Sequence, residues 1–160
     1  MTSLEPGDPA TRLSLGDAQR AAPLDAAAPS EMDLVRRAPA EAHQIAGMRT
    51  AVVTLADACG MTEAARADIA LAVSEACTNV VMHAYIDAPA PGPLTVEASH
   101  RDSELVVAVR DEGRGMLPRT DSPGLGLGLS LIGRLSHRVE IGQNGARGTD
   151  LRLTFLATEK

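Results

Sequence analysis

The spacing of apolar residues changes along this chain, and that change constrains the fold more than any other feature. Between residues 40 and 58 the apolar positions recur every three or four residues, which predicts a helix. Gly60 ends this helix, and Thr62 caps a second helix that is predicted to run to about Ala84. Beyond residue 93 apolar and polar residues alternate, which predicts strands.

Several strands follow from that alternation. They are predicted over residues 94–98, 105–109, 139–141 and 151–155. A turn at residues 101–103 makes the first two a hairpin, and a short helix from 128 to 135 separates the two pairs. This order of elements predicts an α/β fold. We expect a two-layer sandwich in which helices cover one face of a mixed, mainly antiparallel sheet.

The N-terminal segment, residues 1–38, differs in composition from the rest of the chain. It is rich in Ala, Pro, Asp, Ser and Gly and has no sustained apolar period. We predict a disordered tail there, because such a segment cannot bury enough apolar surface to offset the entropy of ordering it. Within it, residues 32–35 also fit an edge strand. The predicted folded domain is therefore residues 39–158.

Composition excludes several classes of function. The 160 residues fit a single domain, the net charge is −6, and Tyr85 and Phe155 are the only aromatic residues. These features argue against a protein that binds nucleic acid directly. Two cysteines, Cys59 and Cys77, are too few for a disulfide framework. No secretory signal and no run of about 18 apolar residues is present, so we expect a cytoplasmic protein without a membrane span.

A polar stripe lies on the second predicted helix. Glu75, Asn79 and His83 are four residues apart, so they share one face. One interpretation is a solvated helix edge. The other is a metal and phosphate site, because the Asn carboxamide oxygen is a hard ligand suited to Mg²⁺ and the Glu carboxylate can hold a water or hydroxyl.

Two glycine-rich motifs and a third short one follow. Residues 111–115, Asp-Glu-Gly-Arg-Gly, come directly after a predicted strand and fit either a tight turn or a pocket for a flat base. Residues 124–129, Gly-Leu-Gly-Leu-Gly-Leu, open a helix and fit either a flexible loop or an anion site. A Walker A loop needs a lysine after its last glycine, and none is present here. The dinucleotide fingerprint does not fit the glycine spacing. Gly148-Thr149 begins the last strand and has no meaning alone.

Taken in order, these motifs resemble the GHKL ATPase superfamily over about residues 41–156. The resemblance is closer to the anti-sigma-factor serine kinases. Residues 74–79, Ser-Glu-Ala-Cys-Thr-Asn, followed by His83-Ala-Tyr85, are similar to their N box. Residues 111–115 are similar to their first glycine box. The fold implied by this resemblance is the Bergerat-type ATP-binding fold.

The resemblance implies ATP and Mg²⁺ as cofactors. It implies that Asn79 ligates the Mg²⁺ that bridges the phosphates and that Glu75 is the general base. It further implies an adenine pocket in which the Asp111 carboxylate accepts a hydrogen bond from the adenine amino group. The other members of that pocket are Gly113, Gly115 and Thr149.

The resemblance also implies an ATP lid that wraps the phosphates, formed by Gly124, Gly126 and Gly128. His83 is expected to have a structural role or to support the site residues without touching the ligand. The implied partners are a sigma factor and an anti-sigma antagonist protein that carries the phosphorylated serine. A homodimer is favoured.

Two hypotheses for function remain at this point. The first is a serine/threonine protein kinase that binds a sigma factor and phosphorylates an antagonist, thereby regulating transcription. The second is a non-catalytic, nucleotide-dependent regulator that acts by binding alone. The second is motivated by a short lid between Met116 and Gly126, where Gly124 stands in the place of a basic residue that the kinases often carry.

Overall fold

The computed structural model describes residues 33–115 and 125–157. In the described part of the chain the helical elements are η2 (Ala42–Gln44), α1 (Ile45–Ala58), α2 (Glu63–Asn79), η3 (Val80–Ala84) and α3 (Leu125–Leu135). The predicted cap of α2 is confirmed, because the Thr62 hydroxyl oxygen accepts a hydrogen bond of 3.2 Å from the Ala65 amide. Gly60 has a φ of 75° and allows the sharp turn between α1 and α2. None of the described helices is long and apolar enough to cross a bilayer.

The sheet is built from β1 (Asp33–Pro39), β2 (Pro93–Arg101), β3 (Glu104–Asp111), β4 (Arg138–Asn144) and β5 (Gly148–Leu156). Their order is β1-β2-β3-β5-β4. Each pairing among these described strands is antiparallel. The sequence pattern suggested a mixed, mainly antiparallel sheet, and the described strands contain no parallel pair. The predicted α/β two-layer class is confirmed.

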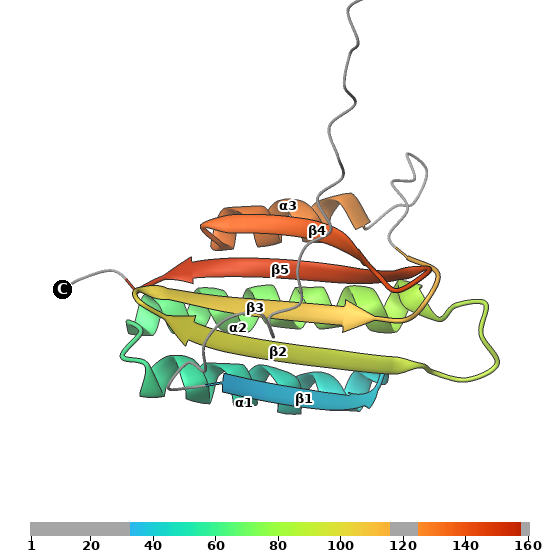
Figure 1. Cartoon of the computed structure of the whole chain (residues 1–160), viewed down its shortest axis with the longest axis horizontal. Coiled ribbons are helices and arrows are strands. Elements are labelled where there is room, and N and C mark those ends of the chain that lie inside the picture. Colours follow the sequence, from blue (N-terminus) through green and yellow to red (C-terminus); the bar gives the residue numbers. More distant parts are fainter. Residues whose placement is uncertain (1–32, 116–124, 158–160) are drawn as a thin grey trace, which may run out of the picture.

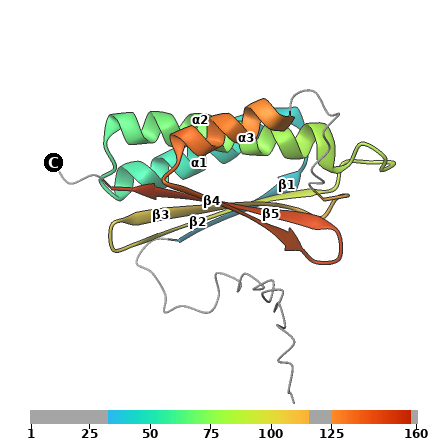
Figure 2. The same ribbon diagram turned by 90° about the horizontal axis from the view of Figure 1, so that it is seen from above.

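The helices lie together on one face of this sheet, and the other face carries no helix from the described residues (Figures 1 and 2). Alternate residues of each central strand point into the space between the layers. The core there is fully buried and includes Leu94 and Val96 of β2, Val107 of β3, and Leu153 of β5. Ile69 and Val73 of α2 meet them from the helix layer.

The first strand requires a correction to the predicted tail. Residues 33–38, assigned to the tail, belong to β1, which pairs with β2 along its whole length. Leu34 and Ala38 pack against the core while the residues between them are mostly exposed. An edge strand that buries so few side chains has nearly the composition of a disordered tail. Composition alone therefore led to the wrong assignment of residues 33–38. The folded domain therefore includes residues 33–38 as well. Residues 1–32 and 158–160 lie outside the described residues, and the predicted end of the domain at residue 158 stays a prediction.

Two predicted helices differ in detail from prediction, although the second ends at Ala84 as predicted. The second predicted helix changes from α-helix to a five-residue π-helical turn, η3, immediately after Asn79. Turns of this kind often occur at functional sites, because the extra residue in the turn re-aims the side chains around it. The third helix begins at Leu125 rather than at residue 128, so Gly126 and Gly128 lie in its first turn.

Candidate functional site

The first part of the site is the contact between α2 and α3. A methyl group placed on Gly128 would lie 3.4 Å from the Asn79 Oδ1 atom and 3.4 Å from the Glu75 Oε2 atom. The structure therefore brings three predicted site residues together across two helices that are distant in sequence. Because residue 128 has no side chain, space remains between α3 and the two polar groups.

Asn79 is the most informative member of this group. The residue is 9% exposed, and its Nδ2 atom is buried without a hydrogen-bond partner among the described residues. An unpaired buried polar group costs about 1–3 kcal/mol, so an amide kept in this position favours a ligand that would pair with it. Glu75 is half-buried one turn earlier, and its carboxylate has no hydrogen-bond or ion-pair partner within the described ranges.

The second part of the site is centred on Asp111, the last residue of β3. The residue is 4% exposed. The Oδ1 atom accepts hydrogen bonds from the amide of Gly113, at 2.9 Å, and from the amide of Thr149, at 3.4 Å. Burial raises the pKa of Asp111 above its ordinary value, and the hydrogen bonds from Gly113 and Thr149 offset only part of that shift.

Glycines let the backbone after Asp111 come close to its neighbours. A methyl group on Gly113 would overlap the carbonyl oxygen of Ala84, and the next amide, that of Arg114, donates to the same oxygen at 2.9 Å. Gly115 has a φ of 81° and lies against the carbonyl oxygen of Arg147. Both positions exclude a side chain, which explains the Gly-x-Gly pattern of this loop.

A cavity of about 500 Å³ lies beside this loop. It is lined by Arg114, Gly115, Ile141, Gly142, Gln143, Ala146, Arg147, Gly148 and Thr149. Ile141 is 52% exposed, so the cavity has an apolar wall on β4 close to the Thr149 contact with Asp111. A flat base with a polar edge fits such surroundings.

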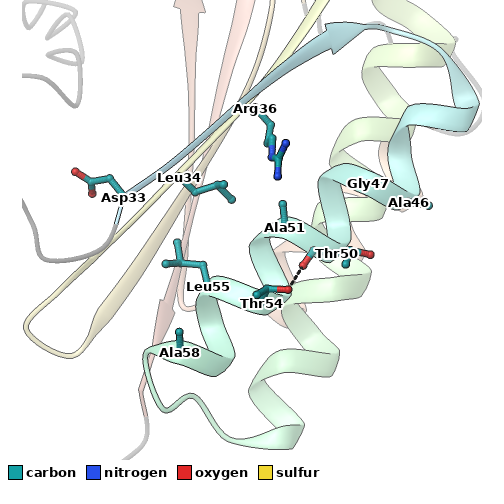
Figure 3. A pocket seen from close by; sticks show the side chains of 10 residues that line it. All are labelled: Asp33, Leu34, Arg36, Ala46, Gly47, Thr50, Ala51, Thr54, Leu55 and Ala58. Carbon is teal, nitrogen blue, oxygen red and sulfur yellow. Dashed lines mark hydrogen bonds between the residues drawn. The ribbon is translucent and has the colours of Figure 1, made fainter.

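A different cavity, of about 670 Å³, lies between β1 and α1. Figure 3 shows Leu34 and Arg36 of β1 facing Ala51 and Leu55 of α1 across it. None of the predicted site residues lines this groove, so its position does not link it to the site described above.

The remaining predicted site residues are only partly described. Gly126 lies in the first turn of α3. Gly124 and the rest of the predicted lid, residues 116–124, lie outside the described residues. His83, predicted to be structural, is half-buried in η3.

Two residues outside the predicted site, Asn144 and Gly148, support Asp111. Gly148 begins β5, and a methyl group there would overlap the carbonyl oxygen of Asp111 and lie 2.8 Å from that of Asn144. The Asn144 side chain donates to the Asp111 carbonyl oxygen at 2.9 Å. The sequence marks both as turn residues, but the contact depends on β3 pairing with β5, which their order in the sequence does not reveal.

The fold and the site together define the class of the protein. An antiparallel sheet covered on one face by helices is the fold expected of GHKL ATP-binding domains. The chain belongs to the histidine kinase-like ATPase domain family, whose pattern it matches over residues 38–155.

Two similar proteins give a more specific comparison than the family does. The chain is 32% identical over 117 residues to an anti-sigma F factor of Caldanaerobacter subterraneus, covering 66% of this chain and 80% of the relative. It is 31% identical over 118 residues to the serine-protein kinase RsbW of Halalkalibacterium halodurans, covering 64% and 71% respectively.

The fold is also that of a solved structure, the RsbU and RsbW domains of a Mycobacterium tuberculosis protein, with a TM-score of 0.63 and 24% identity. That match covers 81% of this chain and 33% of the longer one.

Proposed function

We propose that this protein is an ATP-dependent serine/threonine protein kinase of the anti-sigma type, which binds a sigma factor and phosphorylates an antagonist protein in the cytoplasm. The observation that carries the proposal is the meeting of Glu75, Asn79 and Gly128 at the contact of α2 with α3. The similarity to anti-sigma F factor and RsbW relatives supports the choice of partners. A homodimer belongs to the same proposal.

The residues present fit ATP with Mg²⁺. The buried Asn79 Nδ2 atom lacks a partner within the described part of the chain and could donate to a phosphate oxygen, while the carboxamide oxygen of the same side chain is a ligand that Mg²⁺ accepts. The described residues contain no cluster of three or more His, Cys, Asp or Glu side chains that could hold a metal by themselves. We propose that one amide, phosphate oxygens and water would hold the magnesium ion.

The base of the nucleotide would be recognised at the other part of the site. When ionised, the Asp111 carboxylate accepts hydrogen bonds only, so it pairs with the amino group of adenine and repels the carbonyl group that guanine has there. Thr149 holds the carboxylate in place and also lines the neighbouring cavity. These contacts select adenine over guanine.

Glu75 would act on the acceptor hydroxyl. Its carboxylate lies beside Asn79 and has no partner among the described residues, so it is available to accept the proton of a serine hydroxyl. Mg²⁺-ATP supplies the phosphoryl group and the neutralisation of its charge. Gly128 keeps the space in front of both side chains open.

Phosphotransfer to the cognate antagonist tests this function. The purified protein, Mg²⁺-ATP and the antagonist should give phosphoserine on the antagonist, and Glu75→Gln should abolish transfer while ATP binding persists. Asp68→Asn, an exposed acidic position on the same helix, is the matched control and should transfer normally. If ATP binds but no antagonist is phosphorylated, the kinase proposal is wrong and a regulator that acts by binding alone replaces it.

A further inference from the structure

Tyr85, the residue after the π-helical turn, links three segments that surround the site. Its hydroxyl group donates a hydrogen bond of 2.6 Å to the carbonyl oxygen of Pro93, at the start of β2. The same oxygen accepts a hydrogen bond of 2.8 Å from the amide of Glu112, the residue after Asp111. One side chain therefore fixes the start of β2 and the loop that follows β3 relative to η3.

The surroundings hold this side chain in one position. A methyl group on Gly92 would overlap the Tyr85 ring, so the loop before β2 lies directly against the ring. Tyr85 is half-buried, and burial raises its pKa above the ordinary value of 10.0. The hydroxyl stays protonated at neutral pH and can donate and accept at the same time.

A second link runs parallel to the first. The carbonyl oxygen of Ala84 accepts a hydrogen bond of 2.9 Å from the Arg114 amide, and Gly113 lies against the same carbonyl group. The segment formed by η3 and Tyr85 thus holds the loop after Asp111 at both Glu112 and Arg114. Because η3 starts directly after Asn79, this short segment connects the phosphate half of the proposed site to its adenine half.

We propose that Tyr85 is a positioning residue for base recognition, which acts by fixing the backbone between Asp111 and Glu112. This inference rests on the proposed nucleotide site. Tyr85 does not itself touch the base in this account. Its hydroxyl group limits the movement of the Asp111 carboxylate. A carboxylate held in place cannot move away from a guanine carbonyl group, and this increases the preference for ATP over GTP.

Amide hydrogen exchange tests the link without any nucleotide. The Glu112 amide should exchange slowly in the unsubstituted chain although its residue is exposed, and Tyr85→Phe should speed its exchange about fivefold or more by removing the acceptor. Thr54→Val, which removes a hydroxyl hydrogen bond on α1, is the control and should leave Glu112 unchanged. Rapid exchange of Glu112 in the unsubstituted chain, or the same rate in Tyr85→Phe, would overturn the inference.

Dissociation constants for Mg²⁺-ATP and Mg²⁺-GTP complete the test. Tyr85→Phe should reduce the preference for ATP over GTP about fivefold, because it loosens the group that discriminates the bases. A residue that only stabilises the fold would lower the melting temperature and leave this preference unchanged. If the unsubstituted chain prefers ATP and Tyr85→Phe keeps the full preference, the role of Tyr85 is refuted and the proposed function stands. If the unsubstituted chain binds no nucleotide, both are refuted.

Discussion

The buried Asp111 carboxylate, which we propose pairs with adenine, is kept at some cost to the stability of the nucleotide-free protein. Burial raises its pKa in the folded state above the ordinary value, so the folded protein holds this proton more tightly than the unfolded chain does. The contribution of Asp111 to the free energy of unfolding is therefore fully present below the unfolded pKa and is lost as pH rises through the folded pKa. At neutral pH the ionised form weakens the nucleotide-free fold.

Replacement of Asp111 by asparagine should separate stability from binding. The new side chain in the Asp111→Asn variant retains an oxygen that can accept the Gly113 and Thr149 amides but carries no charge. We expect a higher melting temperature than that of the unsubstituted protein at pH 7, and a difference that shrinks as pH falls towards about 4. ATP affinity should fall about 10- to 100-fold with the loss of a charged acceptor.

Melting curves across pH and titration with ATP measure the two effects of Asp111→Asn. Asp68→Asn, at an exposed position, is the control and should change neither quantity. A melting temperature at pH 7 below that of the unsubstituted protein would contradict the assignment of a buried, penalised carboxylate.

At the scale of elements, the contact of α2 with α3 sets how much space lies beside the Glu75 and Asn79 side chains. Gly128 lies in the first turn of α3 and faces Glu75 and Asn79, whereas at Gly133, further along the same helix, a methyl group would have no neighbour within 4 Å. Alanine at either position should stabilise the helix by up to about 1 kcal/mol. Only the alanine at residue 128 places a methyl group in front of the polar pair.

Gly128→Ala should therefore keep or raise the melting temperature of the nucleotide-free protein and weaken Mg²⁺-ATP binding at least about tenfold. Gly133→Ala is the matched control and should gain similar stability with unchanged binding. Calorimetric titration of both variants measures the difference. Equal ATP affinity in the two variants would show that the space beside Asn79 is not used by the nucleotide.

A second glycine pair tests the hairpin between β4 and β5. A methyl group on Gly148 overlaps two carbonyl oxygens, one of them that of Asp111, while a methyl group on Gly142 approaches the Asp150 carbonyl oxygen only to 3.8 Å. Gly148→Ala should lower the free energy of unfolding by about 1–3 kcal/mol, and Gly142→Ala by less than about 1 kcal/mol. Denaturant unfolding measures both values, and equal losses would contradict the close approach of β5 to Asp111.

The sequence predicted most elements because long runs of regular spacing define them. The Thr62 cap, the hairpin at 101–103 and the helical stretches are local features, and the structure confirms them. The change to a π-helical turn after Asn79 was not predicted, because apolar spacing barely distinguishes it from α-helix. The supports of Asp111 from Asn144 and Gly148 depend on the pairing of β3 with β5, which is a property of the whole sheet.

At the scale of the molecule, β1 decides where the folded domain begins. It pairs with β2 over seven positions from Asp33 to Pro39, and Leu34 and Ala38 pack against the core. A chain that begins at Asp33 should retain the melting temperature of the whole protein. A chain that begins at Ala40 should lose at least about 2 kcal/mol of unfolding free energy with the apolar contacts of β1.

Chemical denaturation of the two shortened chains checks this boundary. Equal stability would show that β1 adds nothing to the fold and would restore the predicted boundary at residue 39. A large loss already in the chain that begins at Asp33 would show that residues 1–32 stabilise the domain.

The most direct test of the account is the melting temperature with Mg²⁺ alone and with Mg²⁺ plus ATP, ADP or GTP, for the unsubstituted protein and Asn79→Ala. A nucleotide at about 100 times its dissociation constant adds about 2.7 kcal/mol of stability, which is several degrees for a domain of this size. We predict such a shift with the adenine nucleotides, little with GTP, and its loss in Asn79→Ala. No shift with any nucleotide, or an equal shift in Asn79→Ala, would contradict the proposed site.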